Sequence, residues 1–311
     1  MKDTILFGDC RETLKEFTSK ARMCVTSPPY YGLRDYGGED SQIGQEQTPE
    51  EYIQQLVEVF REVRNVLTDD GTCWINIGDS YYNYRPGRGQ GLVKQTVSNT
   101  RQDLPDVCPR RGNRLEGLKE KDLIGIPWML AFALRADGWY LRQDIIWHKP
   151  NPMPESVRDR CTKSHEYIFL LSKNRKYFYD NEAIKEPVKK DWGTRDRTNG
   201  KYHNKGTGLQ PHSGLTKSYT TKNKRSVWSV TNKSYKGAHF ATYPPDLIEP
   251  CIKAGSEKGD TILDPFMGSG TTAVVAKTLG RNYIGCELHE EYGKLIKKRL
   301  GEQSFGKLDL I

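Results

Sequence analysis

The sequence predicts an α/β fold, in which a doubly wound and mostly parallel sheet carries helices on both faces. The last third of the chain indicates this most clearly, because apolar strands at 261–263 and 282–286 alternate with helical patterns at 271–279 and 290–300. A glycine loop joins the first of these strands to its helix, as in a βαβ unit. With 311 residues, the chain is long enough for one large α/β domain or two small ones.

The first third of the chain contains two short strands, at 5–7 and 22–26, separated by a short helix at 10–18. The second strand runs into Ser27–Tyr30, where two consecutive prolines lack backbone N–H groups and hold φ at about −65°. A rigid loop is therefore predicted at the strand end. We expect one small volume there to be faced by a hydroxyl, a main-chain carbonyl and an aromatic ring. Such a set can bind a flat base that carries an amino group, because the two oxygens accept its N–H groups and the ring stacks on it. Taken alone, the motif is more typical of a proline turn before a packing tyrosine.

A long helix is predicted after Thr48, which is a suitable N-cap. Pro49 takes the first helical position, and Glu51 completes a capping box. Apolar side chains recur at helical spacing as far as Asp70–Gly71, which is expected to end the helix. The next strand is predicted at 72–78.

The middle of the chain is less regular. Residues 80–120 are polar and rich in Gly, Arg and Tyr without a usable period, which indicates an insertion close to a site. An apolar helix at 127–136 and strands at 140–148 and 166–172 follow. Ser226–Val230 is interpreted as a further strand that returns the chain to the body of the fold.

Positive charge is concentrated in one segment. The formal net charge is +8, and residues 187–236 contain 12 Lys and Arg against two acids, which leaves 36 basic and 38 acidic residues in the rest of the chain. Such an asymmetry favours a polyanionic partner, because neutralisation of phosphates supplies the sequence-independent part of nucleic-acid affinity. A solvated charged loop is the alternative that charge alone leaves open.

Composition narrows the class of protein. A mean hydropathy of −0.76 and the lack of any long apolar run predict no membrane partner. The first residues lead directly into a strand, without the pattern of a signal peptide. The seven cysteines form no C-x-x-C pair, so we expect reduced thiols in a cytoplasmic protein, with neither disulfides nor a metal site.

The loop Gly268–Gly270 follows Asp264 at a strand end, and Glu287 ends the next strand. The two acids are 23 residues apart, close to the roughly 20 expected between a nucleotide-binding glycine loop and the acid that holds the ribose. The loop lacks the full dinucleotide fingerprint, and no lysine follows the glycines as in a Walker A loop. We therefore predict that the loop backbone approaches an uncharged or zwitterionic part of a cofactor, that Asp264 orients the amino-acid moiety of this cofactor and that Glu287 binds its ribose. A structural turn is the alternative for the glycines alone.

Two motifs together resemble a known family. Asp264–Thr271 is similar to the S-adenosylmethionine-binding motif, and Thr26–Tyr30 to the catalytic motif, of DNA amino-methyltransferases that modify exocyclic nitrogens. The catalytic motif comes first, an order that resembles the permuted beta group of these enzymes. The resemblance implies a permuted Rossmann-like sheet of seven strands, one of them antiparallel, with basic loop insertions. It covers nearly the whole chain outside 80–120 and 187–226.

The resemblance also implies domains, a cofactor and partners. Residues 1–186 and 227–311 would form the catalytic domain, and 187–226 a basic target-recognition insertion. S-adenosyl-L-methionine is the implied cofactor and double-stranded DNA the implied partner, in a prokaryotic cell or as a phage product. The implied catalytic residues are Ser27, Pro28, Pro29 and Tyr30. The implied cofactor-binding residues are Asp9, Cys10, Thr26, His239, Phe240, Pro244, Asp264, Pro265, Phe266, Gly268, Ser269, Gly270, Thr271, Thr272, Glu287 and Leu288. The DNA-binding candidates are Lys149, Lys189, Lys190, Arg195, Arg197, Lys201, Lys222, Lys224 and Arg225.

In the implied mechanism, Ser27 and the Pro28 carbonyl accept the amino hydrogens of a flipped base that stacks on Tyr30, and methyl transfer follows directly. Serine at this motif position resembles the N4-cytosine type, so cytosine N4 is preferred and adenine N6 stays open. Amide methylation of a protein glutamine and a non-catalytic DNA-binding protein are more distant alternatives. C5-cytosine methylation is disfavoured, because it needs a cysteine nucleophile and Cys108–Pro109 reverses the order typical of that family. A cognate restriction endonuclease and a homodimer are left open.

Overall fold

The computed structural model describes residues 2–32, 42–82, 115, 117–188, 220–232 and 243–302. The chain divides into two compact units. The larger unit comprises Met1–Tyr179 and Ser226–Ile311, and the smaller one comprises Asp180–Arg225.

The larger unit is built on one eight-stranded sheet, with the strand order β1-β10-β9-β2-β3-β5-β4-β8. Its strands are β1 (Thr4–Phe7), β2 (Ala21–Thr26), β3 (Leu67–Ile77), β4 (Tyr140–His148), β5 (His165–Ser172), β8 (Val227–Ser229), β9 (Thr261–Asp264) and β10 (Asn282–Glu287). Strand β5 runs antiparallel to both of its neighbours, and every other neighbouring pair is parallel. The predicted α/β class is therefore confirmed, with β8 as an eighth strand beside the seven expected.

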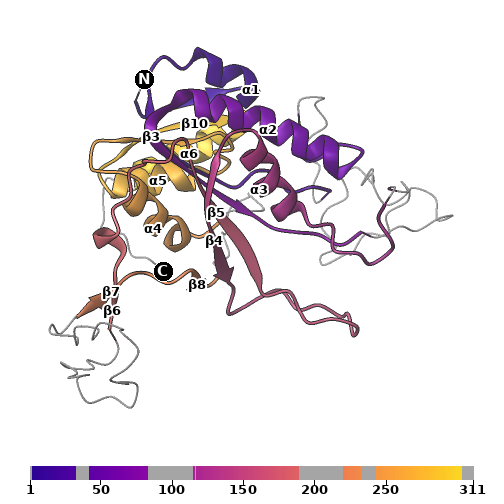
Figure 1. Ribbon diagram of the computed structural model, residues 1–311. Helices are drawn as coiled ribbons and strands as arrows, with labels where there is room; N and C mark the ends of the chain where they lie inside the picture. The colour runs from indigo at the N-terminus through magenta and orange to yellow at the C-terminus, as the bar shows by residue number, and fades with distance from the viewer. Residues whose placement is uncertain are drawn as a thin grey trace, which may run out of the picture. The chain divides into compact units, whose positions relative to one another are not determined.

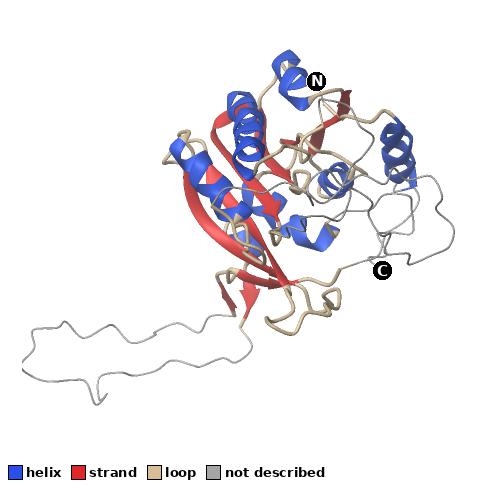
Figure 2. Cartoon of the chain, turned by 90° about the vertical axis from the view of Figure 1, so that its right-hand side faces the viewer, coloured by secondary structure: helices blue, strands red, loops and turns tan. Residues whose placement is uncertain are grey.

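Helices cover both faces of this sheet (Figures 1 and 2). They are α1 (Cys10–Thr13), followed by a short 3-10 helix (Leu14–Glu16), α2 (Pro49–Val66), α3 (Ile126–Ala136), α4 (Pro245–Gly255), α5 (Thr271–Thr278) and α6 (Glu291–Glu302).

Side chains alternate along β3, as the period of a strand requires. Cys73 and Ile75 join the core cluster that contains α2 and α3, whereas Thr72 and Trp74 face Gly255 of α4. No helix in the described ranges combines the length and the apolar character needed to cross a membrane.

The start of α2 was predicted correctly from local sequence. Thr48 Oγ1 accepts a hydrogen bond from Glu51 N at 3.2 Å, and Thr48 N donates to the Glu51 carboxylate at 3.1 Å. The predicted end of this helix was wrong. The helix stops at Val66, and Asp70 and Gly71 lie inside β3.

Tertiary contacts explain this early stop. The pairing of β3 with β2 shifts register between Ala21 and Met23, which leaves the extra residues of β3 as a bulge. The backbone at the bulge is bonded elsewhere, since Lys173 N donates to Gly71 O and Phe178 N to Asp70 O. A Cβ at Gly71 would lie 2.9 Å from Thr68 O, so the bulge needs a glycine.

Helix α3 is capped from a distance. Its N-cap residue, Gly125, has no side chain, and the carboxylate of Asp79 accepts the N–H groups of Gly125 and Ile126 at 3.0 to 3.1 Å. The chain beyond β3 is thus tied to the start of α3. Most of the predicted insertion at 80–120, namely residues 83–114 and 116, lies outside the described residues.

In the smaller unit, β6 (Glu186–Pro187) pairs antiparallel with β7 (Thr221–Lys222), after a 3-10 helix at Glu182–Ile184. Arg225 Nε donates to the Glu186 carboxylate at 3.0 Å. Residues 189–219 lie outside the described part of this unit. The predicted strand at Ser226–Val230 is present as β8, which belongs to the larger unit and pairs with β4.

Candidate active site

The two motifs meet at one edge of the sheet. Strands β10, β9, β2 and β3 are parallel neighbours, so their carboxyl ends lie together, where open α/β sheets bind ligands. This arrangement brings Glu287, Asp264 and Thr26 side by side at the ends of β10, β9 and β2. Thr26 is 238 residues from Asp264 in the sequence, yet its hydroxyl donates to the Asp264 carboxylate at 2.6 Å.

The carboxylate of Asp264 is enclosed by hydrogen-bond donors. Its side chain is 1% exposed. One oxygen accepts from Thr26 Oγ1 and from Phe266 N, the latter at 3.0 Å. The other accepts from Thr272 Oγ1 at 2.5 Å and from the Tyr243 hydroxyl at 3.0 Å. Burial raises the pKa of Asp264, although the bonds from Thr26 and Thr272 act in the opposite direction.

These four bonds use the acceptor capacity of a carboxylate, which has about four lone-pair positions. A direct bond from Asp264 to a cofactor amine would therefore have to replace one of them. Tyr243 also bonds Thr272 and was not among the predicted site residues. Tyr243 directly precedes Pro244, which was among the predicted cofactor-binding residues, and this adjacency is the signal that the sequence offered for it.

The glycine loop is supported from β10. Gly268 and Gly270 have positive φ values of 54° and 81°, which glycine adopts without strain. Gly268 N donates to one oxygen of Glu287 at 2.7 Å, and His289 N donates to the other at 3.0 Å. Glu287 is 8% exposed, and burial raises its pKa in spite of these bonds. Because each carboxylate oxygen has two lone pairs, Glu287 keeps acceptor capacity for a ligand hydroxyl.

Helix α6 also contacts the glycine loop. Arg299 donates to the carbonyl and the hydroxyl of Ser269, both at 2.7 Å, and to the hydroxyl of Thr271 at 3.3 Å. A Cβ at Gly270 would lie 2.9 Å from Ile296, so only glycine allows this packing. The predicted site residues Ser269 and Thr271 thus shape the loop through Arg299, a residue that no local motif indicated.

The proline loop is held by residues from other elements. Pro28 is buried, and the Pro29 carbonyl accepts the Tyr52 hydroxyl at 2.7 Å. The ring of Tyr30 lies against Gly78, where a Cβ would be 2.8 Å from Tyr30 Cε2. Burial and the carboxylate of Glu166 raise the pKa of Tyr30 well above its usual value, while a hydrogen bond with Ser27 lowers it.

A polar network lies next to Tyr30. The Tyr30 hydroxyl donates to Glu166 Oε2 at 2.7 Å, and Asn76 Nδ2 approaches the same oxygen at 3.3 Å. Lys149 forms an ion pair with the other oxygen of Glu166, and its ammonium lies 4.3 Å from the centre of the Trp147 ring. The Lys149 side chain is 17% exposed, so the structure directs it inward and does not favour the predicted phosphate contact. Sequence reasoning missed Glu166 and Asn76.

The remaining predicted cofactor residues lie around these networks. Pro265 is buried, and Phe266, Gly268 and Leu288 are half-buried. Asp9 caps α1 by accepting Arg11 N at 2.8 Å, and it also binds the Arg11 guanidinium. Burial opposes the shift, but these bonds lower the pKa of Asp9. Cys10 is 6% exposed, and burial raises the pKa of its thiol.

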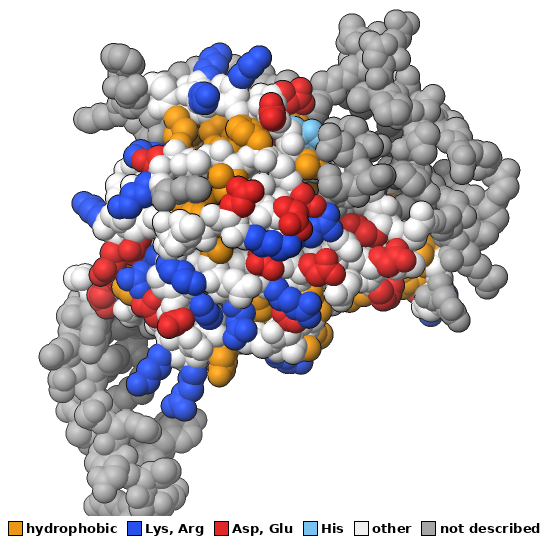
Figure 3. Space-filling model, turned by 90° about the horizontal axis from the view of Figure 1, so that it is seen from above, with side chains coloured by type: hydrophobic (Ala, Val, Ile, Leu, Met, Phe, Trp, Pro, Cys, Tyr) orange, Lys and Arg blue, Asp and Glu red, His pale blue; other side chains and the backbone are white. Residues whose placement is uncertain are grey.

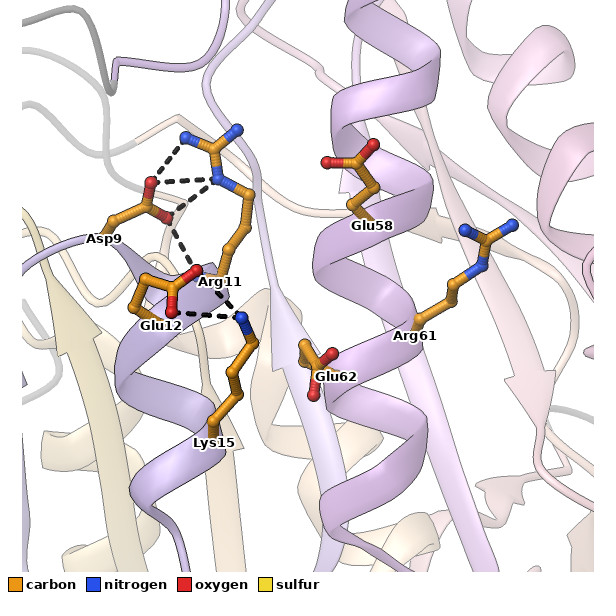
Figure 4. Close-up of a pocket in the computed structure, with 7 residues that line it drawn as sticks. All are labelled: Asp9, Arg11, Glu12, Lys15, Glu58, Arg61 and Glu62. Carbon is orange, nitrogen blue, oxygen red and sulfur yellow. Dashed lines mark hydrogen bonds and ion pairs between the residues drawn. The ribbon is translucent and has the colours of Figure 1, made fainter.

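Asp9 also lines a groove of about 390 Å³ between α1 and α2 (Figure 4). The described residues that line it are all charged, namely Asp9, Arg11, Glu12, Lys15, Glu58, Arg61 and Glu62. Ligand pockets for flat rings are lined mainly by apolar side chains. We therefore do not assign this groove to the cofactor.

Among the described side chains, the face seen from above in Figure 3 mixes Lys and Arg with Asp and Glu, so it offers no continuous positive surface to phosphates.

Several predicted site residues lie outside the described residues. They are His239, Phe240, Lys189, Lys190, Arg195, Arg197 and Lys201. Of the remaining DNA-binding candidates, Lys222, Lys224 and Arg225 belong to the smaller unit. Lys222 and Arg225 both approach the Glu186 carboxylate there, at 4.0 and 3.0 Å.

Known proteins resemble the chain over almost its full length. Residues 21–298 match the model of the N6/N4 family of DNA methylases. The type II methyltransferase M.SmaI of Serratia marcescens is 47% identical over 297 residues, which cover 95% of this chain and 90% of the relative. The solved PvuII DNA methyltransferase, named as cytosine-N4-specific, has a TM-score of 0.63 at 18% identity, covering 99% of this chain and 88% of that one. A putative DNA modification methylase of Thermus thermophilus, solved with S-adenosyl-L-methionine, has a TM-score of 0.59 at 23% identity, covering 97% and 95%. These two solved structures show the fold.

Proposed function

This chain belongs to the N6/N4 family of DNA methylases, and from that premise we propose that it transfers a methyl group from S-adenosylmethionine to the exocyclic N4 amino group of a flipped cytosine in double-stranded DNA. The enzyme class, a DNA methyltransferase that uses S-adenosylmethionine, follows from the family. The choice of base rests on Ser27, the first residue of the Ser27–Tyr30 motif. The observation that carries the proposal is the bond between Thr26 and Asp264, because it joins the proline loop to the glycine loop.

The residues around the glycine loop fit S-adenosylmethionine. Glu287 is buried at the end of β10 and retains lone pairs, so it is suited to accept the ribose hydroxyls. Asp264 acts through the protein, because its four bonds hold the end of β2, the start of α5 and Tyr243 in one arrangement. When bound, S-adenosylmethionine supplies an electrophilic methyl group on its sulfonium sulfur.

On the base side, the proline loop provides the acceptors and the stacking surface. The amino nitrogen of cytosine is conjugated into the ring, so its lone pair is poorly available to a methyl donor. Ser27 Oγ and the Pro28 carbonyl each accept one amino hydrogen, which favours a tetrahedral and more nucleophilic nitrogen. Tyr30 stacks on the base after it leaves the duplex. Methyl transfer then depends mainly on positioning, and the surplus proton leaves afterwards.

The experiment that tests this proposal identifies the product. The purified protein is incubated with unmethylated genomic DNA and S-adenosylmethionine, and the hydrolysed nucleosides are analysed by mass spectrometry. We expect N4-methylcytosine, and the Ser27→Ala variant as a control should make much less of it. N6-methyladenine would keep the enzyme class and overturn the assignment from Ser27. Cofactor binding without either product would point to another substrate, such as a protein glutamine.

Two partners extend the proposal. The name type II methyltransferase of the relatives supports a cognate restriction endonuclease, whose site this protein would protect. The basic insertion at 187–226 is proposed to contact the target DNA, because phosphate neutralisation needs the positive charge that this segment supplies. A homodimer on a palindromic site remains a proposal of the same kind.

A further inference from the structure

The network beside Tyr30 is assembled from three strands. Strand β5 is antiparallel to β3 and β4, so its first residues lie at the edge where β3 and β4 end. Glu166, the second residue of β5, therefore comes close to Asn76 of β3 and to Lys149 just after β4. These residues belong to neither of the two sequence motifs.

Glu166 is held firmly on both of its oxygens. One oxygen pairs with the ammonium of Lys149, and the other accepts from the Tyr30 hydroxyl at 2.7 Å. Asn76 approaches that second oxygen at 3.3 Å and also donates to the Tyr167 carbonyl at 3.1 Å, which fixes the amide. The side chains of Lys149 and Glu166 are only 17% and 15% exposed.

A nearly buried ion pair is weak evidence for stability, because desolvation of the two charges offsets their attraction. The position of the Lys149–Glu166 pair next to Tyr30 instead indicates that the pair orients the tyrosine ring. Gly78 supports one edge of the Tyr30 ring, and Glu166 holds the hydroxyl at its tip. The ring is therefore restrained at two points before any base arrives. Restraint of this kind removes the entropy that a mobile ring would lose on stacking.

We propose that Glu166 is a positioning residue for methyl transfer: supported by Lys149 and Asn76, it holds the hydroxyl of Tyr30 and so presents the ring to the flipped base in a preset orientation. This inference rests on the proposed function, in which Tyr30 stacks on the base. Glu166 itself touches neither the base nor the cofactor in this scheme. It acts through Tyr30.

The kinetic test compares Glu166→Gln, Tyr30→Phe and the double variant. Both single variants keep the shape of the site but remove the charge-assisted hydrogen bond, so each should slow single-turnover methyl transfer about tenfold. If the two residues act as one tether, the double variant should be no slower than the slower single variant. Affinity for S-adenosylmethionine, measured by calorimetry, should stay at the wild-type value in all three. Additive losses in the double variant, or a wild-type rate in Glu166→Gln, would overturn the proposal.

Glu155→Gln is the matched control. Glu155 lies in the same β4–β5 hairpin and also pairs with a cation, Arg160. It has no bond to Tyr30 among those described, so its loss should leave the methyl-transfer rate unchanged. A similar slowing in Glu155→Gln would show that any lost ion pair in the hairpin disturbs the site, and it would remove the specific role of Glu166.

A second measurement does not depend on activity. The protein is labelled with ¹³C-tyrosine, and the Tyr30 phenol signal is assigned by its loss in Tyr30→Phe. The described groups that face this phenol are Glu166, Asn76, Ser27 and Tyr52, and Lys149 pairs with the far oxygen of Glu166. Glu166→Gln should shift this signal, because the Tyr30 hydroxyl loses its charged acceptor, and an unshifted signal would overturn the tether. Wild-type protein that makes no methylated DNA would instead refute the proposed function, whatever Tyr30 does.

Discussion

The two halves of the site hold their carboxylates in different ways. On the cofactor side, Asp264 is 1% exposed, and its described hydrogen-bond donors are all neutral. On the base side, Glu166 is paired with the cation Lys149 and retains 15% of its side-chain exposure. The first network links β9, β2 and α5 within the core, whereas the second lies at the rim around one aromatic ring.

The two carboxylates therefore have different functions. A buried carboxylate saturated with neutral donors cannot change partners without leaving several buried hydroxyls unbonded, so it fixes the backbone of both loops. A carboxylate at the rim that holds a single tyrosine hydroxyl influences mainly that ring. Variants in the first network should therefore affect cofactor binding and stability together, while variants in the second should affect only the transfer step.

The largest effect is expected for Asp264→Ala. The hydroxyls of Thr26, Tyr243 and Thr272 lose their acceptor, and each unmade buried bond costs about 1 kcal/mol or more. We expect the free energy of unfolding to fall by about 3 kcal/mol and the affinity for S-adenosylmethionine to fall at least about 100-fold. Chemical denaturation and titration calorimetry measure the two quantities.

Asp144→Asn is the control for this variant, because Asp144 is an exposed acid on β4. It should change neither quantity. Wild-type cofactor affinity in Asp264→Ala would mean that the Asp264 network does not organise the glycine loop, and the comparison between the two networks would fail.

A smaller and more selective effect is expected for Gly78→Ala. The new Cβ would lie 2.8 Å from Tyr30 Cε2 and 3.4 Å from Glu166 Cδ, so the ring must shift. Displacement of a reacting group by about 1 Å can cost about 100-fold in rate, and we expect a loss of roughly 10-fold to 100-fold in single-turnover methyl transfer. Cofactor affinity should not change.

Gly301→Ala in α6 serves as the control, because a Cβ there meets none of the described atoms within 4 Å. Its rate should equal that of the wild type. If Gly78→Ala weakened cofactor binding as much as it slowed transfer, the two sides of the site would not be separable.

The smallest effect is a dependence of stability on pH. Burial raises the pKa of Asp264 above its ordinary value of 3.8, so the folded state binds its proton more readily than the unfolded chain does. The protonated form therefore contributes stability that is fully present below pH 3.8 and is lost as the pH rises through the folded-state pKa. Between pH 7 and pH 4, the wild type should therefore gain stability relative to Asp264→Asn, which has no carboxyl group to protonate.

Urea denaturation of both proteins across this range measures the gain. Asp144→Asn, which changes an exposed acid on β4, is denatured in parallel as the matched control. The wild type could instead lose stability relative to Asp264→Asn on acidification. That result would indicate that the hydrogen bonds to Asp264 lower its pKa more than burial raises it.

The elements predicted well are those specified by neighbouring residues. The capping box at Thr48 identified the start of α2, and the alternation of apolar strands and helices identified the last third of the chain. The two motifs, each a run of fewer than about ten residues, identified the family and the loops that form the site. Fold class and enzyme family were thus determined by the sequence alone.

The partners of the site residues were decided only in three dimensions. Asp264 bonds Thr26 because β9 lies beside β2, and Glu166 reaches Tyr30 because β5 runs antiparallel next to β3. Because of the same strand order, the Lys149 side chain pairs with Glu166. A hydrogen bond between residues 136 or 238 positions apart depends on which strands are neighbours, and no local period or motif carries that information. The sequence determined which loops form the site, and the packing of the sheet determined what holds them.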